Sequence, residues 1–136
     1  MIRLLRLSFL PQSADAGLLL LRVTLGLSML LLHGWDKLTK FSEKAPGFMS
    51  LFGVVPPTVG FGLAVFAEVF CSALLVLGFL TRFAALNLAI TMSVAFFVAH
   101  GAVLKGPGSG EMALVYLAGF VTLLLAGGGR YSLDRK

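Results

Sequence analysis

Charged side chains and cysteines are scarce in this sequence. Only 12% of the 136 residues are Asp, Glu, Lys or Arg, and Cys71 is the single cysteine. One cysteine excludes an intramolecular disulfide, a CxxC redox pair and a cysteine-rich metal site. With 58% hydrophobic residues and a mean hydropathy of +0.97, a water-soluble domain of this size could not bury its apolar surface. The composition therefore indicates an integral membrane protein.

The few charges that remain are mostly basic. Eleven Lys and Arg against six Asp and Glu give a net charge of +5, and the basic residues lie mainly between the long apolar runs. This spacing suits the anionic headgroups of a membrane surface better than the phosphates of a nucleic acid. We therefore expect the lipid bilayer as the main partner and no nucleic acid.

Four apolar segments are long enough to cross a bilayer as helices. A spanning helix needs about 20 mostly apolar residues, each of which adds about 1.5 Å across a hydrocarbon core of about 30 Å. The sequence therefore predicts one all-α domain over residues 1–136, an integral membrane four-helix transmembrane bundle. The predicted helices cover about residues 14–37, 57–80, 82–104 and 111–128.

The connection between the first two predicted helices is too apolar for a free aqueous loop. It contains Phe41, Phe48, Met49 and Phe52. We expect residues 41–55 to fold back into the membrane interface as a short helix or lid, with a disordered loop as the alternative.

The N-terminal residues mix basic and apolar side chains. Arg3 and Arg6 lie among Ile, Leu and Phe residues until Pro11, which indicates either a segment on the membrane surface or an irregular cytoplasmic tail. The apolar run at residues 7–10 is too short for the hydrophobic region of a signal peptide, so we expect no cleavage there.

The Lys and Arg residues near the helix ends predict the orientation of the bundle. With the N-terminus inside, the inner side carries Arg3, Arg6, Arg82, Arg130, Arg135 and Lys136, and the outer side carries Lys37, Lys40, Lys44 and Lys105. Because segments rich in Lys and Arg tend to stay in the cytoplasm, we predict that both chain termini are cytoplasmic.

Two charged residues are predicted to lie inside the membrane. Glu68 is near the midpoint of the second predicted helix, and Arg22 is about two turns inside the first. A charged residue at the membrane centre costs about 2.5–3.5 kcal/mol on insertion scales, so each needs a partner. The sequence predicts an Arg22–Glu68 ion pair. The alternatives are a pair that only fixes the helix register and an Arg22 that extends to the headgroups.

A second polar group is predicted nearer the outer surface. His33 and His100 each lie about one turn from the outer end of an outward-running helix, so they are level. Lys37 follows His33 by one turn of the helix. Glu111 starts the fourth predicted helix on the same side, and Tyr116 lies about a turn deeper.

Beneath the predicted lid, these side chains could form a pocket for a quinone headgroup. Hydrogen bonds would hold the ring carbonyls, and histidine and carboxylate would pass protons. We assign proton transfer to His33, His100, Glu111 and Tyr116, and ligand binding to Arg22, Lys37, Glu68, Phe48 and Phe52.

Each of these polar residues also has an ordinary explanation. Glu111 can favour a helix N-terminus, Lys37 can anchor a helix at the interface, and a histidine can hydrogen-bond across helices. Two level histidines also fit haem ligation, but they lie near the surface and form one pair. We therefore expect neither a haem nor a metal held with Glu111.

The order and spacing of several motifs resemble those of the DoxX family over nearly the whole chain. The motifs are Arg22-Val-Thr-Leu-Gly26, His33-Gly-Trp-Asp-Lys37-Leu38, Glu68, Gly78-Phe-Leu-Thr-Arg82, Glu111-Met-Ala-Leu-Val-Tyr116 and Gly129-Arg-Tyr-Ser-Leu-Asp134. The resemblance implies a four-helix protein of the bacterial inner membrane.

Relatives of that family are linked to thiosulfate:quinone oxidoreductase and to a membrane oxidoreductase complex with soluble redox partners. The leading expectation is therefore a membrane subunit of a quinone-linked oxidoreductase system, with a soluble or membrane redox partner. The alternatives are a non-catalytic binding or assembly protein for other membrane proteins, and a small-molecule transporter built as a homo-oligomer.

Overall fold

The computed structural model describes residues 1–134, and every regular element within them is a helix, apart from an isolated bridge between Leu51 and Val55. The predicted all-α class is therefore confirmed. Arg135 and Lys136, two of the basic residues behind the predicted orientation, lie outside the described residues.

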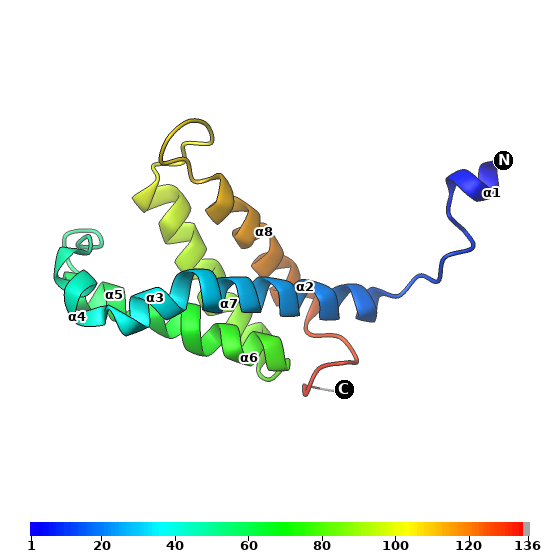
Figure 1. Ribbon diagram of the computed structural model, residues 1–136, viewed down its shortest axis with the longest axis horizontal. Coiled ribbons are helices and arrows are strands. Elements are labelled where there is room, and N and C mark those ends of the chain that lie inside the picture. The colour runs from blue at the N-terminus through cyan, green and yellow to red at the C-terminus, as the bar shows by residue number, and fades with distance from the viewer. Residues whose placement is uncertain (135–136) are drawn as a thin grey trace.

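Four long helices dominate the chain (Figure 1). The first, Ala14–Thr39, joins α2 (Ala14–Met29), a π-helical segment (Leu30–Gly34) and α3 (Trp35–Thr39). The second, Pro57–Leu77, joins α5 (Pro57–Val65), a π-helical segment (Phe66–Cys71) and α6 (Ser72–Leu77). The third joins α7 (Thr81–Val94) to a π-helical segment (Ala95–Ala99), and the fourth is α8 (Glu111–Ala126).

Three of these helices are long and apolar enough to cross a membrane, and α8 is apolar but shorter. At 1.5 Å per residue, its 16 residues span about 24 Å. All four helices end within a few residues of the predicted positions, and two of them end three or more residues early. The second stops at Leu77 because Gly78 takes a positive φ of 70°, and the third stops at Ala99 because Gly101 and Ala102 both have positive φ.

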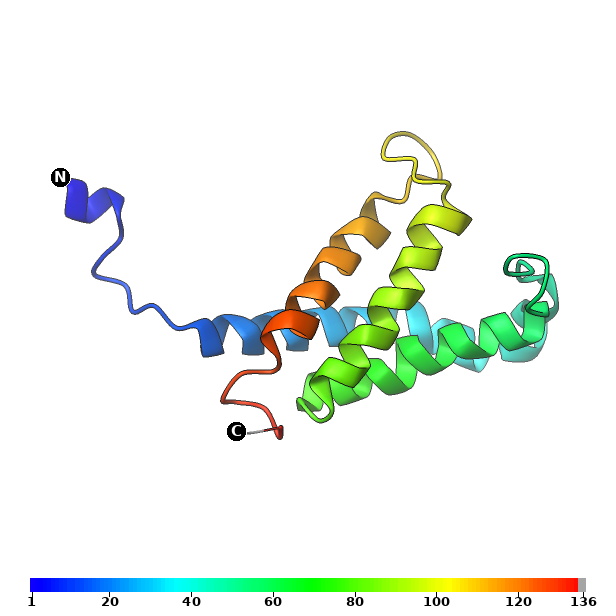
Figure 2. The ribbon, with the colours of Figure 1, turned by 180° about the vertical axis from the view of Figure 1, so that it is seen from behind.

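The long helices form two antiparallel pairs that cross each other (Figures 1 and 2). Ala14–Thr39 runs beside Pro57–Leu77, and α7 packs along α8. The core between the pairs consists of apolar side chains shielded from the surroundings, among them Leu75, Leu88, Phe120 and Leu123. The pairing leaves both the start of α2 and the end of α8 at the same end of the bundle, where Arg130 N–H donates to Asp15 Oδ1 at 3.0 Å.

The connection after the first long helix, which we call the lid (residues 41–55), folds back onto α5. It contains α4 (Phe41–Lys44) and a 3₁₀ turn (Ala45–Gly47). The rings of Phe41 and Phe48 meet the ring of Phe61 edge-on, with centroids 5.3 and 5.4 Å apart. These aromatic contacts hold the lid over one end of α5.

The N-terminal segment lies apart from the bundle. It contains the short helix α1 (Ile2–Leu5), and residues 1–14 are all exposed. Figures 1 and 2 show it extending beyond the start of α2. Its apolar side chains therefore contribute nothing to the bundle core.

Candidate functional site

Glu68 forms a buried ion pair, and its partner is Lys37. Glu68 lies in the π-helical segment Phe66–Cys71 and is 3% exposed. The Lys37 ammonium, from α3, lies 2.7 Å from each of the two Glu68 carboxylate oxygens. The predicted Arg22–Glu68 pair is therefore wrong. Lys37, which was predicted to bind the ligand in the outer pocket, neutralises the intramembrane carboxylate.

The register between the first two long helices explains this pairing. A Cβ atom on Gly34 would lie 2.6 Å from the backbone oxygen of Glu68, so only glycine permits the helices to approach this closely there. Lys37, one turn beyond Gly34, is consequently level with Glu68. Gly26 similarly packs against Ser72 and Val76, which places Arg22 level with the far end of α6.

Arg22 has a structural role at that far end. Its guanidinium, in a residue 2% exposed, donates to the backbone oxygens of Leu75 at 3.2 Å, of Tyr131 at 2.7 Å, and of Val76. Carbonyl oxygens at a helix C-terminus lack partners in their own helix, and a cation satisfies them well. Arg22 therefore ties α2 to α6 and to the residues after α8, and it does not extend to the headgroups.

Residues 127–134, the C-terminal segment, complete this connection. The Asp134 carboxylate accepts hydrogen bonds from Leu80 N–H at 2.7 Å and Thr81 N–H at 2.6 Å, which caps the start of α7. Burial raises the pKa of the Asp134 carboxyl group. Hydrogen bonds from Thr81 and Leu80 and the nearby charge of Arg22 lower this pKa by more, so the net pKa lies below the usual value.

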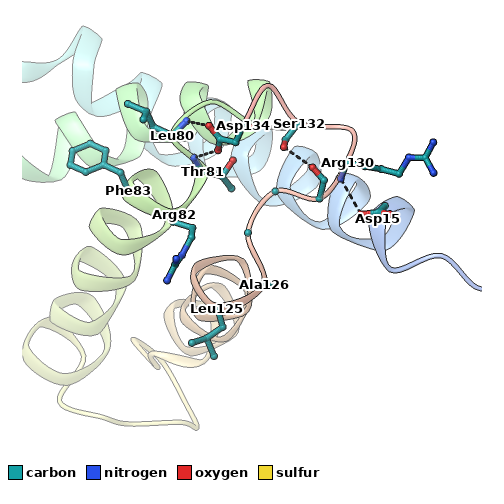
Figure 3. A pocket seen from close by; sticks show the side chains of 13 residues that line it. Asp15, Leu80, Thr81, Arg82, Phe83, Leu125, Ala126, Arg130, Ser132 and Asp134 are labelled. Carbon is teal, nitrogen blue, oxygen red and sulfur yellow. Dashed lines mark hydrogen bonds between the residues drawn. The ribbon is translucent and has the colours of Figure 1, made fainter. Parts of the chain in front are cut away.

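The C-terminal segment also borders a cavity of about 680 Å³, beside α7 and the end of α8 (Figure 3). Arg82 reaches from α7 to the end of α8, where its Nε donates to the Leu124 oxygen at 2.9 Å. The Asp15 and Asp134 carboxylates both accept backbone N–H groups. The charged groups of this cavity thus serve the fold.

A second cavity, which we call the Lys37–Glu68 pocket, lies between the lid, α5 and the end of the α7 helix. Its volume is about 280 Å³. Lys37, Glu68, His100 and Phe48 line it. Lys37, His100 and Phe48 were predicted to belong to the outer pocket, whereas Glu68 was predicted to lie deeper, paired with Arg22. The other walls are mainly apolar. A buried ion pair therefore faces a small apolar pocket.

Distortions of the helices surround this pocket. Lys37 follows the π-helical segment Leu30–Gly34, Glu68 lies within Phe66–Cys71, and His100 directly follows Ala95–Ala99. A π-helical turn inserts an extra residue, turns the following side chains to a new direction and occurs often at functional sites. Three of them around one pocket mark it as the candidate functional site.

His100 has one ring nitrogen committed to the chain. Its Nδ1 lies 2.8 Å from the backbone oxygen of Gly108. A carbonyl oxygen can only accept, so Nδ1 carries the hydrogen in this contact. In the neutral imidazole, Nε2 is then the ring's free acceptor.

His33 and Tyr116 lie on the other side of the bundle, between α2 and α8. Their rings meet at right angles with centroids 5.6 Å apart, and the Tyr116 hydroxyl donates to Ser28 Oγ at 2.8 Å. Neither residue lines the Lys37–Glu68 pocket. The predicted single cluster is therefore divided, and the two histidines have different surroundings.

Glu111 and Phe52 also lie outside the pocket. Glu111 is exposed at the first position of α8, and its side chain has no hydrogen bond or ion pair with the rest of residues 1–134. Phe52 is 75% exposed, in a tight turn at the tip of the lid. Within the described range, no three His, Cys, Asp or Glu residues come together as a metal site.

An exposed charge cluster borders the lid. Asp36 lies 2.8 Å from the Lys40 ammonium and also pairs with Lys44. The hydrogen bond and the charge of Asp36 raise the pKa of Lys40. Exposed pairs of this kind contribute little to stability, so we assign this cluster no role in the candidate site.

Sequence reasoning missed several pocket residues. Thr91 lines the pocket. It could have been found from the sequence, because a polar side chain in the middle of a membrane span is costly and marks a candidate functional residue. Gly60 lies under the lid, where a Cβ would meet Phe48 and Leu51 at 3.4 Å. Nothing in the pattern singled out Leu63 or Ile90, which are ordinary apolar residues of a span.

Comparison of the sequence with known proteins shows the family of this chain. The profile of the DoxX family matches residues 17–101. An uncharacterized membrane protein of Mycobacterium tuberculosis is 32% identical over 139 residues, covering 93% of this chain and 85% of that protein. An uncharacterized protein of Haemophilus influenzae is 34% identical over 116 residues, covering 79% and 81%. No solved structure is significantly similar. The sequence, the helical fold and these relatives agree that the chain is a membrane protein of the DoxX family.

Proposed function

We propose that this protein is a membrane subunit of a quinone-linked oxidoreductase system in the bacterial inner membrane, and that the Lys37–Glu68 pocket binds the quinone headgroup. One observation carries the proposal. A buried carboxylate and its ammonium partner form part of the wall of an apolar pocket, with His100 beside them. A pair needed only for packing would not have to face a cavity.

The residues present fit a quinone ring. An ammonium has three N–H donors, and Lys37 uses two of its donors on Glu68, so one remains for a ring carbonyl. Apolar walls would cover the ring faces. The volume of about 280 Å³ is just below the range of about 300–1,000 Å³ for drug-sized ligands, which suits a single ring.

The roles of the chain's own groups follow from their chemistry. Lys37 would orient a carbonyl oxygen of the ring by hydrogen bonding, and Glu68 would keep the Lys37 ammonium positioned and paired. His100 Nε2 would accept a proton from a ring hydroxyl. A bound quinone would supply two-electron redox chemistry, and a soluble or membrane redox partner would exchange the electrons.

Thermal unfolding of the purified protein in mild detergent tests this proposal. A ring-only benzoquinone at 100 times its dissociation constant should stabilise the parent protein by about 2.7 kcal/mol. The double variant Lys37→Met/Glu68→Leu, which removes both charges together, should lose this response. Lys105→Met, in the exposed connection before α8, is the matched control and should keep it.

The other outcome favours the alternative role. If the parent protein does not respond to a saturating benzoquinone, and a stoichiometric membrane partner purifies with it, the binding or assembly function replaces the quinone proposal. Mass spectrometry and an absorption spectrum of the same preparation would identify any retained lipid-like ligand or haem.

A further inference from the structure

The Lys37–Glu68 pocket has two unlike sides. Toward the lid it is covered by Phe48, Met49 and Leu51. Its side walls include Leu63 of α5 and Ile90 of α7, which are 58% and 55% exposed. Both residues lie within helices long and apolar enough to cross a membrane. Their exposed surface therefore faces lipid, and the pocket opens toward the bilayer.

The arrangement of the helices produces this opening. The helix starting with α7 packs against α6 and against the π-helical segment Phe66–Cys71. Figures 1 and 2 show α7 and the α5–α6 helix diverging from the short turn that joins them, which begins at Gly78. At the level of Leu63 and Ile90 the two helices are separated, and the pocket lies between them.

We propose that the pocket takes an amphiphile with a single polar ring and a long apolar tail, which enters from the bilayer between Leu63 and Ile90 and leaves its tail there. The identity of the ring rests on the proposed function. The position of the tail rests on the exposed walls alone. A pocket of about 280 Å³ holds a ring and no long chain, so a tail must leave through the side that faces lipid.

Two probes separate ring binding from tail binding. The first is 2,3-dimethoxy-5-methyl-1,4-benzoquinone, and the second is the same ring with a ten-carbon alkyl tail. Dissociation constants come from thermal shifts at fixed detergent concentration, so that partition of the tail into micelles is the same for every variant. The quantity compared is the ratio of the two constants.

Variants at the opening test the tail's position. Leu63→Trp narrows the opening of the pocket from the side of α5. Ile90→Trp narrows the opening from the side of α7 and replaces Leu63→Trp if that variant does not fold. Both residues also line the pocket, so each variant should weaken binding of the ring-only probe somewhat. The tailed probe should lose about tenfold more affinity than the ring-only probe, equivalent to the contacts of about two methylene groups. Leu86→Trp, exposed on α7 outside the pocket lining, is the control and should change neither.

Four results would overturn the inference. If the tailed probe still binds more tightly than the ring-only probe in both opening variants, the tail lies elsewhere and ring binding stands. The same follows if Leu86→Trp removes this difference in affinity equally. A ring-only probe that binds as tightly as the tailed probe in the parent protein would also refute it. If neither probe binds the parent protein, the inference and the proposed function both fail.

Discussion

At the scale of single residues, the Lys37–Glu68 pair stands out because its carboxylate is buried. The other ion pairs among residues 1–134 involve Asp36 and are exposed. Removing the partner of a buried charge leaves that charge without compensation and typically costs about 3–5 kcal/mol, whereas replacing both partners by apolar residues is often neutral. The pair is therefore a sensitive place to measure coupling.

The first prediction concerns that coupling. Lys37→Met alone leaves the buried Glu68 carboxylate without a partner and should destabilise the protein by about 3–5 kcal/mol. Glu68→Leu alone should cost less, because the Lys37 side chain is 28% exposed. The double variant should lose much less than the sum of the two single losses. Unfolding in detergent would give the free energies. Arg22→Met combined with Glu68→Leu is the matched comparison. Those two losses should add, because Arg22 binds carbonyl oxygens at the other end of α6.

The second prediction concerns Asp134, whose pKa is lowered in the folded protein. A carboxylate with a lowered folded pKa stabilises the fold above its unfolded pKa of about 3.9, and that contribution disappears as the pH falls through the lower folded value. Asp134→Asn keeps one oxygen acceptor but loses the other and the negative charge, so it should cost about 1 kcal/mol at pH 7, the typical net contribution of one hydrogen bond. The difference from the parent protein should shrink below about pH 4. A difference that stays constant down to pH 2 would contradict this account.

At the scale of elements, the lid and the π-helical segments shape the pocket. The lid contacts α5 through Phe41 and Phe48, and each of three long helices carries a π-helical segment next to a pocket residue. The lid thus covers the pocket on one side, while the distorted helices direct Lys37, Glu68 and His100 toward it.

The third prediction distinguishes the two phenylalanines of the lid. Phe48→Ala should weaken binding of the ring-only benzoquinone, because Phe48 lines the pocket and packs on Phe61. Losing an aromatic contact of about 0.5–1.5 kcal/mol corresponds to a change of roughly 2- to 12-fold in the dissociation constant. Phe52→Ala should leave binding unchanged. Equal losses for both variants would show that the lid acts without the specific contact at Phe48.

The helices themselves were predictable, because apolar runs of the length of a bilayer have few other folded forms. Their ends were less so. Gly78 stops the second helix through its positive φ, and the sequence does not say which glycine will do this. The Lys37–Glu68 pair was missed for a related reason. It depends on the register at Gly34, and two π-helical segments change the level and direction of the side chains that follow them.

At the scale of the whole molecule, the orientation in the membrane rests on the distribution of basic residues. The structure places the start of α2 and the C-terminal segment together, so residue 14 and residues 127–134 lie at the same end of the bundle. Four of the six basic residues predicted for that side lie within the described range. The N-terminal segment, with Arg3 and Arg6, extends from the same end.

The fourth prediction tests this orientation. A reporter that is active only in the cytoplasm should work when fused after Lys136, and one that is active only outside should work when inserted near Lys44, in the lid. The inverse pattern would mean that the excess of Lys and Arg does not set the topology. The Lys37–Glu68 pocket would then lie toward the cytoplasmic side.

The central claim is that the Lys37–Glu68 pocket binds a quinone ring, and the two histidines test it most directly because one lies at the pocket and the other does not. His100 lines the pocket, whereas His33 packs against Tyr116 away from it. The decisive measurement is the dissociation constant of the ring-only benzoquinone for His100→Leu and His33→Leu. His100→Leu should weaken binding by about 1–3 kcal/mol, or roughly 5- to 150-fold, and His33→Leu by less than twofold. Equal effects of the two substitutions, or no binding to the parent protein, would contradict the account.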